Sequence, residues 1–493
     1  MNAAEKQLSY NELLNQFSFI KAENIQLKQE LADLKRLIFG QKRERFIPGQ
    51  LDNQLSFGLG LDPLAGYEES TEQITYQRKK NKVKYTPHSR QELPAHLPRK
   101  EIIIEPEESI AGLKKIGEEI TEELDYKPGT LFVKRYIRPK YAKGKSEGVI
   151  IGNLPSRPID KGIPGPGLLA HIFISKFVDH LPLYRQRQQF KRQGVDLSAS
   201  TLNNWITSGY DLLFPLYELQ RERIIQKGYL MADETPIQVL DKIKKGKTHR
   251  GYFWVYHDPL EKEILFDYQD NRSRAGPFQI LKGFEGFLQT DGYNVYDEIG
   301  QWESITLLGC MAHVRRYFDK SLPNDKKRSE WMLKQIQGLY KTESFARDNH
   351  FSHEERYNLR QSESVPVLDE IKAWLDTEAL LVLPKSTMGK AIGYMLGRWE
   401  YLKRYVEDGC FEIDNNLIEN AIRPVALGRK NYLFAGSHNG AKRSALIYTL
   451  VANAKLQGLE PFAYMRDVIA RIADYPYKEL ADLLPVNWGN QLS

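Results

Sequence analysis

Residues 229–240 read YLMADETPIQVL, a run rich in β-branched and aromatic residues that is typical of a β-strand. Further runs of this kind follow along the chain at residues 252–257, 264–268, 287–289 and 305–308. The sequence therefore predicts a sheet, and with the helical stretches around it an α/β fold.

Two acidic residues stand where predicted strands end. Asp233 lies in the run ADETP and Asp291 in the run TDGY, each beside turn-forming residues. Along a strand, neighbouring side chains point to opposite faces, so Asp233 and Glu234 cannot both point into one site. Such acids are also common as simple turn formers, and the residues alone leave that alternative open.

A third acid, Glu419, lies in the run DNNLIENAIRP. Asp414 or Asn415 can cap a helix there, with Glu419 and Arg423 on one helix face. Three carboxylates, two at strand ends and one on a helix, suit hard divalent cations, which prefer oxygen ligands. Two such ions about 4 Å apart can activate an attacking oxygen and stabilise the leaving oxygen of a phosphodiester.

Basic residues flank these acids in the sequence. His313 and two arginines follow a predicted strand, and another basic group follows Glu419. They either contact DNA phosphates or form a structural network within the protein. The predicted DNA contacts of this group are Arg315, Arg316, Arg423, Arg429 and Lys430.

The stretch before the predicted sheet has the pattern of a helix-turn-helix. A basic helix at 183–193 ends at Gly194, and Ser198 or Ser200 can cap a short polar second helix. Plain helix packing is the alternative reading. The side chains predicted to read base edges are Thr201, Asn203 and Asn204.

Residues 10–45 carry an a/d heptad pattern that favours a parallel, self-associating coiled coil. Only Asn24 is polar at these positions, and a helix packed on the protein's own core is the alternative. The seam positions are Leu13, Phe17, Ile20, Asn24, Leu27, Leu31, Leu34 and Ile38.

The chain resembles the transposases of the insertion sequence 66 family. The resemblance rests on TDGY (290–293), GCMAHVRRYF (309–318) and IDNNLIENAIRPVALGRKNYLFAGS (413–437), and it extends from KRLIFGQKRERF (35–46) to LLPVNW (483–488). It implies a DDE enzyme with a ribonuclease-H-like catalytic core. Residue by residue, it implies that Asp233, Asp291 and Glu419 are the catalytic, metal-binding triad.

The resemblance and the composition together predict a domain order. The expected parts are a coiled coil (10–45), a basic linker (46–100), a small β-rich domain (101–155), a helix-turn-helix-like DNA-binding region (165–226), a catalytic core (227–319 and 411–435), a helical insertion (320–410) and a C-terminal helical region (436–493).

The number of cysteines bears on the zinc part of the cofactor prediction, and the three carboxylates bear on the Mg²⁺ or Mn²⁺ part. Many relatives carry a cysteine-rich zinc-binding element near the β-rich domain, whereas the cysteines here are Cys310 and Cys410. Two cysteines exclude a disulfide framework and a four-cysteine zinc site. We therefore expect two Mg²⁺ or Mn²⁺ ions per active site and no zinc.

These observations predict a transposase that cuts the ends of its element and transfers the 3′-hydroxyl into target DNA. The alternatives are a catalytically inactive DNA-binding regulator and, less compatible with the basic surroundings, a glycosidase. The predicted partners are transposon-end and target DNA, a second copy of the chain, and accessory proteins of the same element. A net charge of +6 is mild, and no apolar run suggests a membrane span, so a cytoplasmic protein is expected. The resemblance implies that it is bacterial and nucleoid-associated.

Overall fold

The computed structural model divides the chain into two compact units, Met1–Leu124 and Asp125–Ser493. Only residues of the second unit are described. The predicted coiled coil and the basic linker lie outside them, as does most of the predicted β-rich domain. No helix in the described part is long and apolar enough to cross a membrane. The described residues are 129, 131–137, 140–142, 149–151, 155–160, 162–240 and 247–489.

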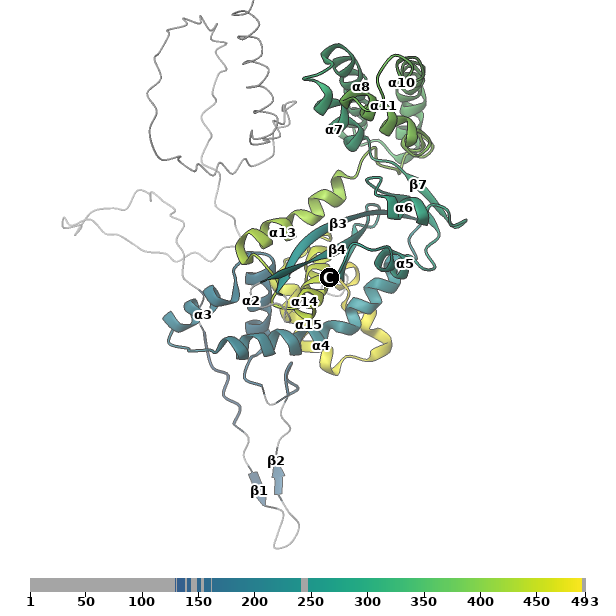
Figure 1. The fold of residues 1–493 in the computed structure, drawn as a ribbon. Helices are drawn as coiled ribbons and strands as arrows, with labels where there is room; N and C mark the ends of the chain where they lie inside the picture. The colour runs from purple at the N-terminus through teal and green to yellow at the C-terminus, as the bar shows by residue number, and fades with distance from the viewer. Residues whose placement is uncertain are drawn as a thin grey trace, which may run out of the picture. The chain divides into compact units, whose positions relative to one another are not determined.

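The centre of the second unit is a five-stranded mixed sheet with the strand order β5-β4-β3-β6-β7 (Figure 1). β5, β4 and β3 are antiparallel neighbours, whereas β3, β6 and β7 run parallel. The runs of sequence that predicted strands are all strands, so the α/β prediction is confirmed. The strands are β3 (Tyr229–Leu240), β4 (Thr248–Asp258), β5 (Glu263–Gln269), β6 (Gly286–Gln289) and β7 (Ile305–Leu308).

Strand β3 is the longest strand of the sheet and pairs on both sides. Its ladder with β4 extends from Met231 to Leu240, whereas its pairing with β6 ends at Met231 and Gln289. Along the chain, α5 follows β5 and α6 follows β6, whereas α13 comes later than all five strands of the sheet. These helices are α5 (Ala275–Ile280), α6 (Asn294–Ile299) and α13 (Asn416–Tyr432).

The free edge of β5 is closed by helix α14 rather than by another strand. Thr449 Oγ1 accepts a hydrogen bond from the N–H of Phe266 at 2.9 Å. The amide of Asn453 accepts from the N–H of Ile264 and donates to its carbonyl oxygen. The C-terminal elements are α14 (His438–Leu456), α15 (Pro461–Arg471), the 3-10 turns η3 (Ile472–Asp474) and η4 (Tyr477–Leu483), and α16 (Pro485–Trp488).

The helical pair before the sheet is present, with a turn at Gly194, whose φ of +83° favours glycine. Ser198 caps the second helix by accepting a hydrogen bond from the N–H of Thr201. The prediction of a short second helix is wrong, because α4 continues through Pro215 and packs on the sheet, where Tyr217 donates to the carbonyl of Phe266. The helices are α2 (Pro166–Phe177), α3 (Leu183–Arg192) and α4 (Ala199–Ile224).

Between β7 and α13 the chain is helical. Helices α7, α8, α10 and α11 form one packed group (Figure 1), in which the rings of Trp331 and Trp374 stack 4.7 Å apart. The elements are α7 (Met311–Ser321), α8 (Lys326–Asp348), α9 (His353–Leu359), the π-helical turn η1 (Arg360–Ser364), α10 (Val365–Glu378), α11 (Thr387–Gly397), α12 (Trp399–Lys403) and the 3-10 turn η2 (Arg404–Val406). Away from this group, β1 (Lys140–Ala142) and β2 (Val149–Ile151) form an antiparallel pair.

A buried ion pair holds the end of this helical group together. Arg360 is fully buried and forms two hydrogen bonds with Glu343, which is also buried. The remaining N–H groups of Arg360 donate to the carbonyl oxygens of Tyr405, Asp408 and Phe411. Because its donors all have partners, this arginine fixes the stretch of chain that leads into α13.

Candidate active site

The first two acids are brought together by strand register. β3 and β6 are parallel, and their last pair joins Met231 to Gln289. Asp233 and Asp291 each stand two residues beyond that pair, in the same chain direction. Since paired strands lie about 4.8 Å apart, the register places the two acids side by side. Both are half-buried.

The loop that carries Asp291 is held from several sides. Asp291 Oδ1 accepts a hydrogen bond from the N–H of Tyr293 at 2.9 Å, and Gly292 has a φ of +88°. The hydroxyl of Tyr394 donates to the carbonyl oxygen of Asp291 at 2.9 Å. Arg398 donates to the carbonyl of Gly292 at 3.0 Å. The backbone of this loop is therefore anchored to α11.

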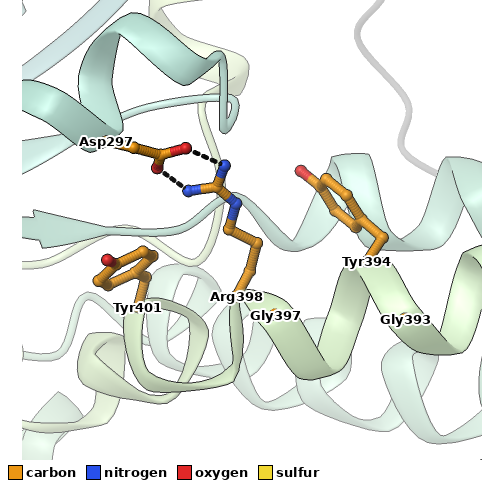
Figure 2. Close-up of a pocket in the computed structure, with 6 residues that line it drawn as sticks. All are labelled: Asp297, Gly393, Tyr394, Gly397, Arg398 and Tyr401. Atoms are coloured by element: carbon orange, nitrogen blue, oxygen red, sulfur yellow. Dashed lines mark hydrogen bonds and ion pairs between the residues drawn. The ribbon is translucent and has the colours of Figure 1, made fainter.

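Arg398 also forms a two-point ion pair with Asp297 of α6 (Figure 2). Tyr394 lies in the last turn of α11 and Arg398 directly follows this helix, about one helical turn later. Both side chains therefore reach the loop from the end of α11. Beside them is an open pocket of about 330 Å³. This anchor could not be predicted from the sequence, because the two residues are more than a hundred positions from Asp291.

Glu419 lies in the first turn of α13, as predicted. The start of this helix is joined to the start of α7. The N–H of Met311 donates to the carbonyl of Ile413, and the N–H of Asn415 donates to the sulfur of Cys310. Asp414 takes the predicted capping role in part, by accepting a hydrogen bond from the N–H of Asn416 at 2.9 Å.

The other end of α13 is joined to β3. Arg429 donates to the hydroxyl of Thr235 at 2.9 Å and to the carbonyl of Pro236 at 2.5 Å. Thr235 is two residues from Asp233 on the same strand. The guanidinium of Arg429, predicted to contact DNA, thus has hydrogen-bond partners within the protein. These contacts favour the alternative that Arg429 is part of a structural network.

The electrostatics of Asp233 link the three acids. Burial raises the pKa of Asp233 well above its usual value, and the carboxylates of Glu234, Asp291 and Glu419 raise it further. A hydrogen bond from the N–H of Glu234 opposes this pKa shift. A group whose pKa is raised by neighbouring carboxylates would be stabilised in its charged form by a bound cation.

Glu234 pairs with Arg272, whose guanidinium lies 3.8 Å from the ring centre of Tyr293. Burial and the Asp291 carboxylate raise the pKa of Glu234, although Arg272 opposes the shift. The placement of Asp233 and Glu234 on opposite strand faces stays a prediction, because the charge of Asp291 acts on both carboxylates. Arg272 was not predicted, because nothing in its sequence context distinguishes it from a loop arginine.

Basic residues of α7 face the acids. A guanidinium nitrogen of Arg316 lies 3.9 Å from a carboxylate oxygen of Glu419, and Arg316 also contacts the ring of His313 at 3.3 Å. Burial, followed by the charge of Arg316, lowers the pKa of His313. Arg315, Arg423 and Lys430 are exposed. Of the predicted phosphate contacts, the structure therefore brings Arg316 to Glu419.

The predicted base-reading residues lie elsewhere, on the first turns of α4. Asn203 and Asn204 are exposed and Thr201 is half-buried. The side-chain amide of Asn203 donates to the carbonyl of Ala199 within the helix. Their role in DNA binding stays a prediction.

The fit of the three acids to a metal ion is partial. Their charges suit a cation, as the raised pKa of Asp233 indicates. However, no three His, Cys, Asp or Glu side chains in the described ranges gather closely enough to hold a metal ion. A carboxylate oxygen of Glu419 lies near Arg316, so the three acids do not form a complete set of metal ligands in this structure.

Comparison with known proteins finds full-length relatives. A protein of Sinorhizobium fredii (strain NBRC 101917 / NGR234), named uncharacterized protein y4jD, is 33% identical over 488 residues, which cover 94% of each chain. Two others from the same strain are y4qI, 33% identical over 92% of this chain and 87% of its own, and y4hP, 32% identical over 94% and 89%. These relatives carry no described activity.

Shorter family models match the two ends of the chain. Residues 26–102 match a model described as transposase C of IS166 homeodomain, and residues 449–486 match the IS66 C-terminal element. Residues 109–142 match the zinc-finger binding domain of transposase IS66. This last match contradicts the predicted cofactor set, which excluded zinc. The prediction relied on counting cysteines, and the matched stretch contains neither Cys nor His, so the domain had to be recognised from its other residues.

The longest match covers the region that contains the sheet, the three acids and the helical group. Residues 161–443 match the model of the transposase IS66 family, which is more than half of the chain. The match includes Asp233, Asp291 and Glu419. With this match and the shorter ones on both sides, the chain belongs to the IS66 family of transposases.

Proposed function

We propose that this chain is a DDE transposase whose catalytic residues are Asp233, Asp291 and Glu419. The observation that supports this most directly is the raised pKa of Asp233, which results from burial and, in addition, from the negative charges of Glu234, Asp291 and Glu419. Two of them come from parallel neighbouring strands and one from the helix α13, which is tied to the same sheet. Nothing in a plain DNA-binding domain requires three acids to be held together.

The sheet supports a ribonuclease-H-like core. It has three antiparallel strands followed by two parallel ones. The first acid lies on the central strand β3 and the second just after its parallel neighbour β6. The helical segment α7–α12 then stands as an insertion between the second acid and Glu419.

The reaction is a pair of phosphoryl transfers. In the first, water attacks the phosphodiester at the end of the element, and the 3′-oxygen leaves and becomes a 3′-hydroxyl. In the second, that hydroxyl attacks a target phosphodiester, and a target 3′-oxygen leaves. A divalent cation held by the three acids would supply Lewis acidity to both transfers. Both transfers pass the phosphorus directly between oxygens, so no covalent bond between protein and DNA forms.

The acids must be charged to act. Asp233 has a raised pKa because it is buried and its neighbours are negative, so cation binding and loss of its proton are coupled. Arg316 contacts Glu419 and is exposed, so it can neutralise either this acid or a DNA phosphate. In this proposal, DNA binding draws Arg316 toward phosphate.

Further parts of the chain would recognise and assemble the DNA ends. The coiled coil at 10–45 pairs two copies, the helices α3 and α4 read the end sequence, and Arg315, Arg423 and Lys430 contact phosphates. Accessory proteins of the same element complete the complex. Such a protein acts in the bacterial cytoplasm, at the nucleoid.

The test is cleavage of labelled duplexes that carry the inverted repeats flanking the gene. The reaction is run with EDTA and with the chlorides of magnesium, manganese and zinc in turn. We expect metal-dependent nicking that leaves a 3′-hydroxyl and falls at least about 10³-fold in Asp233→Ala, Asp291→Ala and Glu419→Ala. Binding of the same duplexes should remain in all three variants.

A DNA-binding regulator without catalysis is the second candidate, and it is favoured by the open ligand set around Glu419. It predicts tight, specific binding of the inverted repeats with no cutting under any metal condition. Adding the other proteins of the element separates the candidates, because a regulator stays inactive in their presence. Cleavage that survives in one of the alanine variants would remove that acid from the triad.

A further inference from the structure

One face of helix α7 combines an aromatic ring with positive charge. His313, Arg316, Tyr317 and Lys320 are spaced three, four and seven residues apart, so they lie on the same side of the helix. Arg316, Tyr317 and Lys320 are exposed. Arg316 contacts Glu419, which places this face at the candidate active site.

Tyr317 is not a freely moving surface residue. Its ring stacks on the ring of Tyr394, with 4.4 Å between the ring centres and 20° between the planes. Tyr394 in turn donates its hydroxyl to the carbonyl of Asp291. The two rings therefore form a short column that begins at the loop of the second acid and ends at the exposed ring of Tyr317.

Positive charge surrounds the outer end of the column. The ammonium nitrogen of Lys320 lies 5.8 Å from the centre of the Tyr317 ring. A rigid, exposed aromatic ring flanked by cations is the arrangement that binds single-stranded nucleic acid, because a base stacks on the ring while the cations contact the phosphates. A base within an intact duplex cannot stack in this way, since both its faces are already covered.

We propose that Tyr317 stacks on an unpaired base of the DNA strand at the active site, with Lys320 and Arg316 on the adjacent phosphates. The inference rests on the proposed function, because it names the form of the substrate which that site binds. Stacking would offset part of the free energy needed to unpair the base. The chain should therefore bind a DNA end more tightly when one base near the cut is already unpaired.

The experiment measures binding to duplexes with the inverted-repeat end, in EDTA so that no cleavage occurs. A single mismatch is moved through the positions around the end of the repeat, and each duplex has a partner in which the unpaired nucleotide is abasic. For the full chain, we expect a mismatch at one or two adjacent positions to tighten binding about tenfold. The abasic partner should lose this gain, because it has no base to stack.

Variants of the column then identify the ring responsible. Tyr317→Ala should abolish the tenfold gain, whereas Tyr317→Phe should keep it. Tyr394→Phe should also keep it, because only the hydroxyl is lost. The matched control is Tyr357→Ala, which removes a ring that is 38% exposed on α9, compared with 36% for Tyr317. This control should keep the gain.

The outcomes separate the two proposals. Equal binding of paired and mismatched ends by the unaltered chain, or a full gain in Tyr317→Ala, overturns the stacking site and leaves the transposase proposal standing. Failure of the unaltered chain to bind any inverted-repeat duplex overturns both. A fluorescent 2-aminopurine at the favoured position should be quenched by the unaltered chain and not by Tyr317→Ala.

Discussion

Asp233 lies within β3 and Asp291 lies two residues beyond β6, whereas Glu419 lies on a helix that follows the whole α7–α12 segment. Asp233 is placed by the main-chain hydrogen bonds of the sheet, and Asp291 depends in addition on the contacts of its loop with Tyr394 and Arg398. Glu419 is placed by contacts of α13 with distant parts of the chain. Those contacts are the hydrogen bonds of residues 413 and 415 to the start of α7 and of Arg429 to β3.

This difference indicates where the site can be disturbed. Side-chain substitutions leave a β-ladder largely intact, so Asp233 should keep its position in most variants, whereas the loop of Asp291 also depends on Tyr394 and Arg398. The helix acid depends on a few side chains, and each can be removed singly. Variants of those side chains should therefore impair catalysis while leaving the sheet and the binding of DNA in place.

The largest effect is expected for Arg360→Met. It leaves Glu343 buried with only Arg356 as its partner and frees three carbonyl oxygens near the start of α13. We expect the free energy of unfolding to fall by roughly 3 kcal/mol, measured by urea denaturation, with cleavage reduced in parallel.

The control for Arg360 is Arg328→Met, which removes a partly exposed ion pair with Asp325 and Glu378 on the same helical group. Its effect should be about 1 kcal/mol or less. Equal losses in the two variants would mean that the buried network has no special role in holding the chain before α13.

Arg429→Met should have a smaller and more selective effect. Losing its bonds to Thr235 and Pro236 releases the end of α13 from β3. We expect cleavage to fall about tenfold, with little change in DNA affinity or in its salt dependence.

Lys430→Met is the matched comparison, because Lys430 is exposed on the same helix. If it contacts phosphate, its loss should weaken binding and reduce the slope of log affinity against log salt by about one. A loss of slope in Arg429→Met as well would restore Arg429 to the DNA-binding set.

The smallest of the expected effects is a change in the melting temperature of the variant Asp233→Asn. Because burial and neighbouring carboxylates raise the native pKa of Asp233, the folded protein holds this proton to a higher pH than the unfolded chain. The unaltered protein therefore loses stability as the pH rises through that window, and the Asn variant does not. Without metal at pH 8, the variant should melt a few degrees higher, and the difference should vanish at acid pH.

Asp160→Asn is the control for this melting comparison, because Asp160 is exposed. It should melt as the unaltered protein does at both pH values. A variant Asp233→Asn that melts lower at pH 8 would show that the carboxylate cluster does not strain the folded state.

The sequence predicted the strands, and the position of Asp291 just after one of them, because period-two patterns and turn residues are local. The prediction that Asp233 stands at a strand end was wrong, because β3 continues through Pro236 to Leu240 in its ladder with β4. It also predicted the helix of Glu419 and the turn at Gly194. It missed the length of α4, because Pro215 is tolerated inside a helix that packs on the sheet. Tyr394 and Arg398 could not be predicted, since their contacts with the Asp291 loop join positions far apart in the chain.

Thr449 and Asn453 bear on how copies of this chain can assemble. By occupying the main-chain groups of Ile264 and Phe266, they leave β5 unable to accept a strand from another molecule along that stretch. Copies of the chain that come close together are therefore protected, on this side, from fusing into a continuous sheet. Any association between copies would have to use other surfaces.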